Sequence, residues 1–221
     1  MAQSMIHRLY GNKIQETGHR TEGHMCVTEE DRHLARHNKG SLLYGELLPR
    51  GVNRALDSRH LDSHNGESLF DLGMGTGKVV LQVFMQCPHL KYVYGVELSH
   101  ARFRIAESAA LKMVEAGNCG PFHGGDHQVH DTYNATTAAD GAGLGHSSSL
   151  PRVRFHVEEH VRNRSLRVWD RAHVDPHTGK PRELHLEWNN LLEVEHLNAA
   201  DFVLLETDIP MDSMLPLACL L

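Results

Sequence analysis

The stretch SLFDLGMGTGKVVLQVF, residues 68–84, decides the fold that we expect for this chain. Its first four residues, 68–71, suit a short buried strand, and glycines at alternate positions then make a tight turn. An apolar segment from about residue 78 to residue 86 follows and predicts a helix. The chain is therefore expected to pass from a buried strand through a glycine turn directly into a helix.

The next two elements repeat this order. YVYGVE at residues 92–97 is rich in β-branched and aromatic residues and predicts a second strand. Residues 100–117 place apolar side chains such as Phe103, Ala110 and Met113 on one face, which predicts an amphipathic helix. Strand, helix, strand and helix at these lengths are typical of a βαβ unit with parallel strands.

The glycine motif, Asp71 to Lys78, can be compared with three classes of ligand-binding turn. A phosphate-binding P-loop has four residues before its Gly-Lys pair and then Ser or Thr, but here only three separate Gly73 from Gly77, and Val79 follows. A dinucleotide-binding turn has the spacing Gly-x-Gly-x-x-Gly, which this motif misses by one residue. An acid followed by three alternate glycines is instead typical of S-adenosylmethionine-dependent methyltransferases of the doubly wound α/β class.

The chemistry of S-adenosylmethionine agrees with this motif. The cofactor has a zwitterionic methionine end and no pyrophosphate, so it needs close backbone approach at Gly73, Gly75 and Gly77 rather than a phosphate cradle. A helix that begins near Lys78 offers free N–H groups and the positive end of its dipole. Glu97 ends the second strand, where an acid accepts both ribose hydroxyls in sheets that bind ligands at the carboxyl ends of their strands.

Around this unit the expected organisation is less regular. Residues 1–40 are polar and rich in His, and we expect an N-terminal extension with one helix near residues 29–37. Residues 41–221 are the expected catalytic domain, and Pro49 suits the first turn of its first helix.

Two later segments differ from the rest in composition. Residues 117–150 contain no Lys or Arg and predict a flexible insertion. Residues 152–188 alternate apolar and polar side chains around the turn sequence DPHTGK, which predicts β-structure. The expected strands of the parallel core are residues 68–71, 92–97, 183–188 and 202–206.

Composition limits the classes of function. With 221 residues the chain makes one large domain or one domain with extensions, and 40% apolar residues allow a packed core. A net charge of −6 argues against a nucleic-acid binder that uses its whole surface, because such surfaces are basic. No apolar run approaches the ~20 residues of a membrane span. Four scattered cysteines predict free thiols, and the His pairs lack a third ligand, so we expect no metal site.

Three stretches together carry a resemblance to a known family: YGELLPRGV at residues 44–52, FDLGMGTGKVVLQVFMQ at 70–86, and YGVE at 94–97. They resemble the disruptor-of-telomeric-silencing family, the histone lysine methyltransferases that lack a SET domain. The run VVLQV after the glycines is the most specific part. The resemblance covers residues 41–116 well and 183–210 weakly, and Lys78 and the ending LLETDIP are similar to the protozoan branch.

The resemblance implies which residues bind the cofactor. The loop Tyr44-Gly45-Glu46 closes over its methionine end. Lys78 replaces a Gln of the family and is suited to pair with the cofactor carboxylate. At the adenine end Asn190 and Leu191 replace the usual Asp and Phe. The implied set is Tyr44, Gly45, Glu46, Asp71, Gly73, Gly75, Gly77, Lys78, Glu97, Asn190 and Leu191.

The catalytic residue is left unassigned by the sequence. Glu206-Thr207-Asp208 falls where animal and fungal members of the family have an Asn-Asn-Phe type motif beside the substrate channel. No strong general base is needed once the lysine amine is deprotonated and aligned with the methyl group.

The resemblance implies a nuclear histone lysine N-methyltransferase that modifies a lysine in the core of histone H3 on nucleosomes. Residues 152–182 have a local net charge of +4 and are either a basic arm that contacts DNA phosphates or a solvated hairpin face. Two alternatives stay open: another class I methyltransferase acting on a different protein or a small molecule, and an inactive cofactor-binding fragment.

The C-terminal end of the chain carries a last expectation. A sheet of this class normally has seven strands, and only 13 residues follow Asp208, too few for three more strands. We therefore expect a doubly wound methyltransferase fold that is truncated after its fourth core strand.

Overall fold

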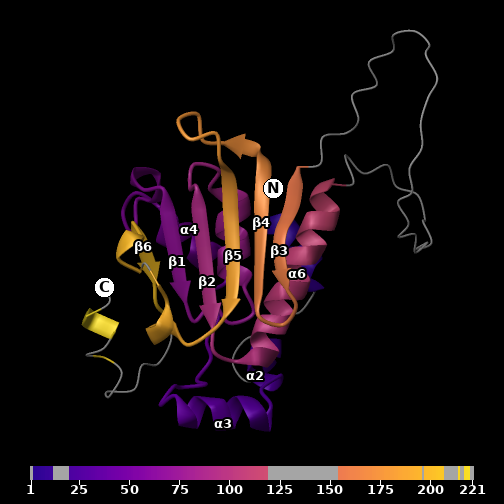
Figure 1. Cartoon of the computed structure of the whole chain (residues 1–221), viewed down its shortest axis with the longest axis vertical. Helices are drawn as coiled ribbons and strands as arrows, with labels where there is room; N and C mark the ends of the chain where they lie inside the picture. The colour runs from indigo at the N-terminus through magenta and orange to yellow at the C-terminus, as the bar shows by residue number, and fades with distance from the viewer. Residues whose placement is uncertain are drawn as a thin grey trace, which may run out of the picture.

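A six-stranded sheet forms the centre of the molecule in the computed structural model, which describes residues 2–11, 20–118, 154–195, 197–206, 214 and 217–219 (Figure 1). The order of strands across the sheet is β3-β4-β5-β2-β1-β6. The strands are β1 (Ser68–Leu72), β2 (Tyr92–Glu97), β3 (Phe155–Val161), β4 (Ser165–Val174), β5 (Pro181–Trp188) and β6 (Phe202–Leu204).

The helices begin and end where local chemistry allows. In α3 the Thr28 side chain caps the Asp31 N–H while the Asp31 carboxylate accepts from the Thr28 N–H, a reciprocal capping box. Pro49 opens α4, where its missing N–H costs nothing. The helices are α1 (Ala2–Tyr10), α2 (Glu22–Met25), α3 (Glu29–His37), α4 (Pro49–Leu56), α5 (Lys78–Gln86) and α6 (His100–Asn118), with 3-10 turns at Ser63–Asn65, Leu191–Glu193 and Leu197–Ala199.

The four strands expected in the core are confirmed and are parallel. β1 pairs in parallel with β2 on one side and with β6 on the other, and β2 pairs in parallel with β5. The β-rich segment then extends the same sheet, because β4 pairs antiparallel with β5, and β3 pairs antiparallel with β4. The sheet is therefore mixed, with a parallel half around β1 and β2.

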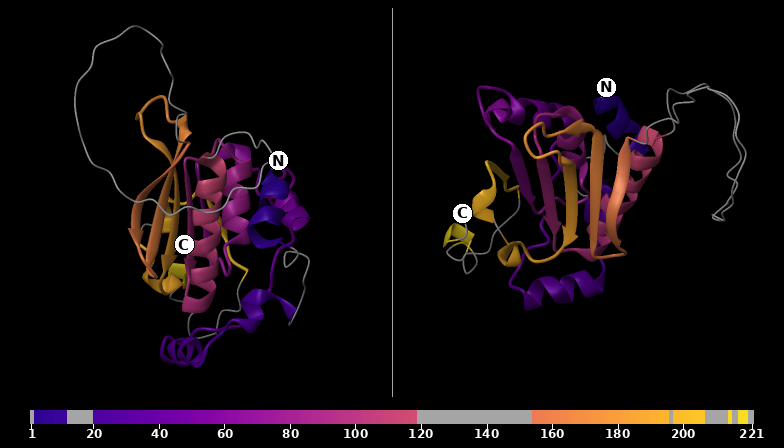
Figure 2. Two further views of the ribbon diagram at one scale, coloured as in Figure 1. Left: turned by 90° about the vertical axis from the view of Figure 1, so that its right-hand side faces the viewer. Right: turned by 45° about the horizontal axis from the view of Figure 1, so that its top comes forward.

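The two faces of the sheet are covered differently. Helices α1, α4, α5 and α6 lie on one face (Figure 2), where side chains such as Leu69, Val93 and Leu184 enter the main core. On the opposite face Phe70 and Tyr94 belong to a smaller cluster with residues from 191–205 and Leu217. The α/β architecture is confirmed, whereas helices on both faces, as in a doubly wound fold, stay a prediction.

The N-terminal residues contribute to the core. The sequence predicted one helix here, at residues 29–37, and α3 lies there, but it did not predict α1. Ile6 of α1 is fully buried, and α1 contacts both α5 and α6. In this structure α1 is therefore packed against the β–α–β unit rather than attached loosely to it.

Some expectations fall on residues outside those the structure describes. They are the insertion beyond residue 118, Thr207 and Asp208, and most of the apolar C-terminal run on which the expected truncation rests. Among the described helices, none is long and apolar enough to cross a membrane.

Candidate functional site

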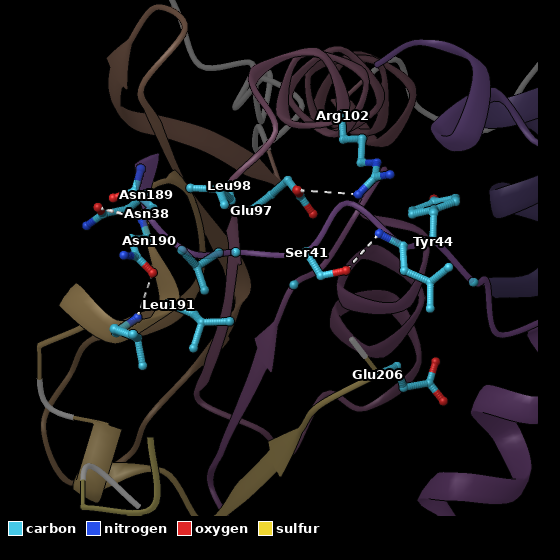
Figure 3. Close-up of a pocket in the computed structure, with 16 residues that line it drawn as sticks. Asn38, Ser41, Tyr44, Glu97, Leu98, Arg102, Asn189, Asn190, Leu191 and Glu206 are labelled. Carbon is cyan, nitrogen blue, oxygen red and sulfur yellow. Dashed lines mark hydrogen bonds and ion pairs between the residues drawn. The ribbon is translucent and has the colours of Figure 1, made fainter. Parts of the chain in front are cut away.

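The carboxyl ends of the parallel strands meet at one edge of the sheet, and two adjoining pockets lie there. The strand-end pocket (Figure 3) is lined by parts of the loop 38–45, the end of β2, and residues 189–192 after β5. The turn pocket lies beside the glycine turn and the start of α5. Both pockets are lined by Tyr44, Gly45, Gly73 and Glu206, which therefore mark the place where the pockets meet.

The glycine turn has a backbone that other residues rarely adopt. Gly75 and Gly77 have φ values of +56° and +81°. A Cβ at Gly75 would also lie 2.5 Å from a ring carbon of Tyr44, and a Cβ at Gly77 would lie 2.7 Å from the Cβ of Ala106. The first glycine lets Tyr44 pack on the turn, and the second lets α5 and α6 approach each other.

Glu97 ties the end of β2 to this turn. Its Oε2 accepts a hydrogen bond from the N–H of Gly75 at 2.8 Å, and its Oε1 accepts one from the N–H of Ser99 at 2.7 Å. The residue is 5% exposed and lines the strand-end pocket. Burial raises the pKa of its carboxyl, and Arg102 opposes that shift. Each oxygen keeps a second lone pair that a ligand hydroxyl can use.

The loop Tyr44-Gly45-Glu46 is fastened to the turn by polar contacts. The Tyr44 hydroxyl donates to Oε1 of Glu46 at 2.7 Å and lies 3.1 Å from the hydroxyl of Thr76. The Lys78 ammonium, at the first residue of α5, pairs with Oε2 of Glu46 at 2.5 Å. Both side chains of that pair are more than nine-tenths buried. The resemblance implied that Lys78 pairs with the cofactor carboxylate, whereas in this structure it pairs with Glu46.

Two side chains that the sequence analysis did not single out also build the site. Arg102 of α6 donates to the carbonyls of Gly23 at 2.8 Å and Leu42 at 2.7 Å, and its guanidinium lies 4.3 Å from the centre of the Tyr44 ring. Tyr10 of α1 donates to the Thr76 carbonyl at 2.7 Å. Arg102 stands on the apolar face of a predicted amphipathic helix, which was the one local indication of its role.

Besides Glu46, three acids line the two pockets: Asp71 in the turn pocket, Glu97 in the strand-end pocket, and Glu206 in both. Asp71 is 4% exposed, and burial together with Glu206 and Glu97 raises its pKa to about 8. Partial burial also raises the pKa of Glu206. No hydrogen bond or ion pair reaches the Asp71 carboxyl from the described part of the chain. This concentration of acids favours a ligand that brings positive charge.

The far end of the strand-end pocket follows β5. Asn190 and Leu191, which the resemblance assigned to the adenine end, both line it. The side-chain oxygen of Asn190 accepts from the N–H of Leu192 at 3.1 Å, which fixes the amide at the start of a 3-10 turn. Asn189 and Leu192, which the sequence analysis did not name as ligands, line the same end.

The fold and the site together define an α/β protein with a ligand site at the carboxyl ends of parallel strands. Residues 24–122 match the family model of the histone methylation protein DOT1. The resemblance to this family predicted from the sequence is thereby confirmed, and the matched segment contains the loop of Tyr44, the glycine turn and Glu97. No curated protein matches the chain.

Proposed function

We propose that this chain is an S-adenosylmethionine-dependent histone lysine N-methyltransferase of the DOT1 kind. The observation that carries the proposal is that the glycine turn, the start of α5 and the acids Asp71 and Glu97 lie together at the carboxyl ends of the parallel strands. All of these residues lie within the segment that matches the DOT1 family model.

The residues present fit this cofactor by their chemistry. Asp71 is a buried acid without a hydrogen-bond donor among the described residues, and the α-ammonium of a methionine moiety would supply one. The free N–H groups at the start of α5 suit its carboxylate, whereas the Lys78 ammonium is already paired with Glu46. Glu97 suits the ribose hydroxyls, and Asn190 with Leu191 suits the adenine. When bound, the cofactor supplies a methyl group on a sulfonium.

In this scheme the residues of the chain position the cofactor and the substrate and form no covalent bond with them. Tyr44 and Glu46 line the turn pocket beside the glycine turn and are hydrogen-bonded to each other. Arg102 holds the preceding loop through the Leu42 carbonyl. Such alignment supplies most of what methyl transfer to a deprotonated amine needs.

We propose a lysine in the folded core of histone H3, presented on a nucleosome in the nucleus, as the acceptor. The support is the family match and the acidic site, which suits a cationic substrate.

Fewer cations of residues 152–182 are free to contact DNA phosphates than the net charge of this segment suggested. Arg182 is 3% exposed and donates to two backbone carbonyls, and Arg154 pairs with Asp170. In the described part of this segment, residues 154–182, the exposed cations that remain for phosphates are Arg162, Arg164, Arg171 and Lys180.

One assay tests the function and its alternatives together. The 221-residue chain is first titrated with S-adenosylmethionine by calorimetry and is then offered nucleosomes, free histones and n-butylamine as acceptors. We expect binding, and methyl transfer to nucleosomes that falls steeply with salt if phosphates are contacted. Equal transfer to n-butylamine would favour a small-molecule methyltransferase. Binding without transfer to any acceptor would favour a cofactor-binding fragment.

A further inference from the structure

Glu206 occupies a position that no other acid of the site has. It follows β6, and its side chain lines both the strand-end pocket and the turn pocket. Asp71 lines the turn pocket, whereas Glu97 lines the strand-end pocket. Figure 3 places Glu206 on the side of the pocket opposite Asn189 and Asn190. It therefore stands where ligands of the two pockets would come together.

The carboxylate of Glu206 is available for a ligand. The residue is exposed, unlike Asp71 and Glu97, so a macromolecule can reach it from solvent. Within the residues that the structure describes, no hydrogen bond or ion pair involves it. Lys78 and Arg102, the two cations of the site, are engaged elsewhere, with Glu46 and with backbone carbonyls.

The acceptor of the proposed reaction arrives with a proton that must leave. A free lysine amine has a pKa of about 10.4, so at neutral pH it enters the site as an ammonium without a lone pair. Loss of that proton requires an acceptor within hydrogen-bond reach. An exposed carboxylate whose pKa is raised by partial burial accepts a proton more readily than an ordinary surface acid.

We propose that Glu206 is a catalytic residue that pairs with the substrate ammonium where the two pockets meet and takes up its proton; this rests on the function proposed above. In that step one N–H bond of the ammonium breaks and its electron pair stays on nitrogen as the lone pair. An O–H bond forms on the Glu206 carboxylate, and the proton then passes to water. Asp71 is less suited to this role because it is buried away from the entering substrate.

The charged and titratable groups around Glu206 come from every element of the site. They are Tyr44 and Glu46 of the loop, Asp71 of β1, Lys78 of α5, Glu97 of β2 and Arg102 of α6. Because Glu206 and Glu97 both raise the pKa of Asp71, the carboxylates lie close enough for an ammonium entering here to be stabilised by more than one of them. Glu206 differs from the others in being the acid that solvent and a substrate side chain reach first.

The test compares the wild-type chain with Glu206→Gln and with Glu115→Gln, an exposed carboxylate of α6 outside both pockets and outside residues 152–182. Calorimetry with S-adenosylhomocysteine tests the proposed function, and we expect affinities within threefold for all three chains. With nucleosomes we expect kcat of Glu206→Gln to fall by about 100-fold or more. We also expect it to lose the rise of kcat/KM with pH that reflects Glu206 ionisation. Saturation-transfer NMR with n-butylammonium adds a readout that needs no turnover, and its signal should be lost in Glu206→Gln alone.

The outcomes of these measurements distinguish failure of the proposed cofactor site from failure of the role proposed for Glu206. If no chain binds S-adenosylhomocysteine, the proposed cofactor site fails, whereas the n-butylammonium signal still judges Glu206. If the cofactor analogue binds but Glu206→Gln keeps the wild-type kcat, pH profile and amine signal, the role of Glu206 is overturned. If wild type binds the analogue but transfers no methyl group, loss of the amine signal in Glu206→Gln supports the pairing, and its retention overturns it.

Discussion

Glu97 and Gly75 are joined by a hydrogen bond of 2.8 Å that runs from a strand end to the middle of the glycine turn. One carboxylate therefore shapes the turn and also faces the strand-end pocket. Replacing it should affect folding and ligand binding together, in contrast to a residue that only touches a ligand.

We expect Glu97→Ala to lower both stability and cofactor affinity. The substitution leaves the N–H groups of Gly75 and Ser99 without their acceptor, at a cost of about 1–3 kcal/mol for each buried group. The Kd for S-adenosylmethionine should rise tenfold or more, because charge-assisted hydrogen bonds to the ribose are lost. Thermal unfolding and calorimetry measure the two effects. Normal cofactor binding by a folded Glu97→Ala chain would contradict the assignment.

The buried pair Lys78–Glu46 should show strong coupling. Breaking a buried ion pair costs about 3–5 kcal/mol because the remaining charge is left without compensation. We expect Lys78→Gln and Glu46→Gln each to destabilise the fold, and the double variant to lose less than the sum of the two. Denaturant unfolding of the four chains gives the coupling energy.

The exposed pair Arg32–Glu29 provides the matched control for this cycle. Its side chains are 52% and 85% exposed, so its coupling should not exceed about 0.5 kcal/mol. Equal coupling in the two pairs would mean that burial of Lys78 and Glu46 does not strengthen their interaction.

Asp71→Asn should stabilise the chain at high pH. Burial raises the pKa of Asp71 from 3.8 to about 8, so the folded state binds more protons than the unfolded state between these values. The stability of the wild-type chain therefore falls as pH rises through this window. The neutral amide of Asp71→Asn does not ionise, so the variant does not lose this stability. We expect the Tm of Asp71→Asn to exceed that of wild type above pH 8 by at least about 2–4 °C, the shift for 1 kcal/mol. The difference should vanish near pH 4, and cofactor affinity should fall.

Asp201→Asn is the control, because its effect on stability should have the opposite dependence on pH. The N–H of Glu67 and the N–H and hydroxyl of Ser68 donate to the Asp201 carboxylate and lower its pKa. Its contribution is present above the unfolded pKa and is lost as pH falls. This substitution should therefore lower Tm at neutral pH, and the difference in Tm from wild type should be smaller at acidic pH. If both substitutions shifted Tm in one direction at pH 8, the assigned pKa of Asp71 would be wrong.

The sequence predicted the elements whose pattern is local. The glycine spacing and the apolar runs placed β1, α5, β2 and α6 within a few residues of their observed bounds. The positions of Tyr44, Lys78 and Glu97 around one turn follow from the same motif and its family resemblance.

Contacts between distant residues could not be predicted in this way. The hydrogen bonds of Tyr10 to Thr76 and of Arg102 to Gly23 join residues more than 60 positions apart, and no periodicity records them. Arg182 is an intermediate case. The sequence analysis counted it in the basic segment, as part of a DNA-contacting arm or a solvated hairpin face, and both interpretations are wrong for this residue because it is buried. Strand alternation, which places Arg182 on the same face as Leu184 and Leu186, was the local signal for its burial.

Arg102→Lys should loosen the loop over the site without unfolding the chain. The guanidinium bonds two carbonyls at once and stacks on Tyr44, whereas a lysine ammonium is a single point charge that does not reproduce this planar arrangement. We expect a lower Tm and a Kd for S-adenosylmethionine raised about tenfold, since two charge-assisted hydrogen bonds of about 1.5–3 kcal/mol each are weakened. The matched control is Arg104→Lys on the same helix, whose side chain is 43% exposed and pairs with Glu107. That variant should bind the cofactor as wild type does, and an equal loss in both variants would show that Arg102 acts only through the stability of α6.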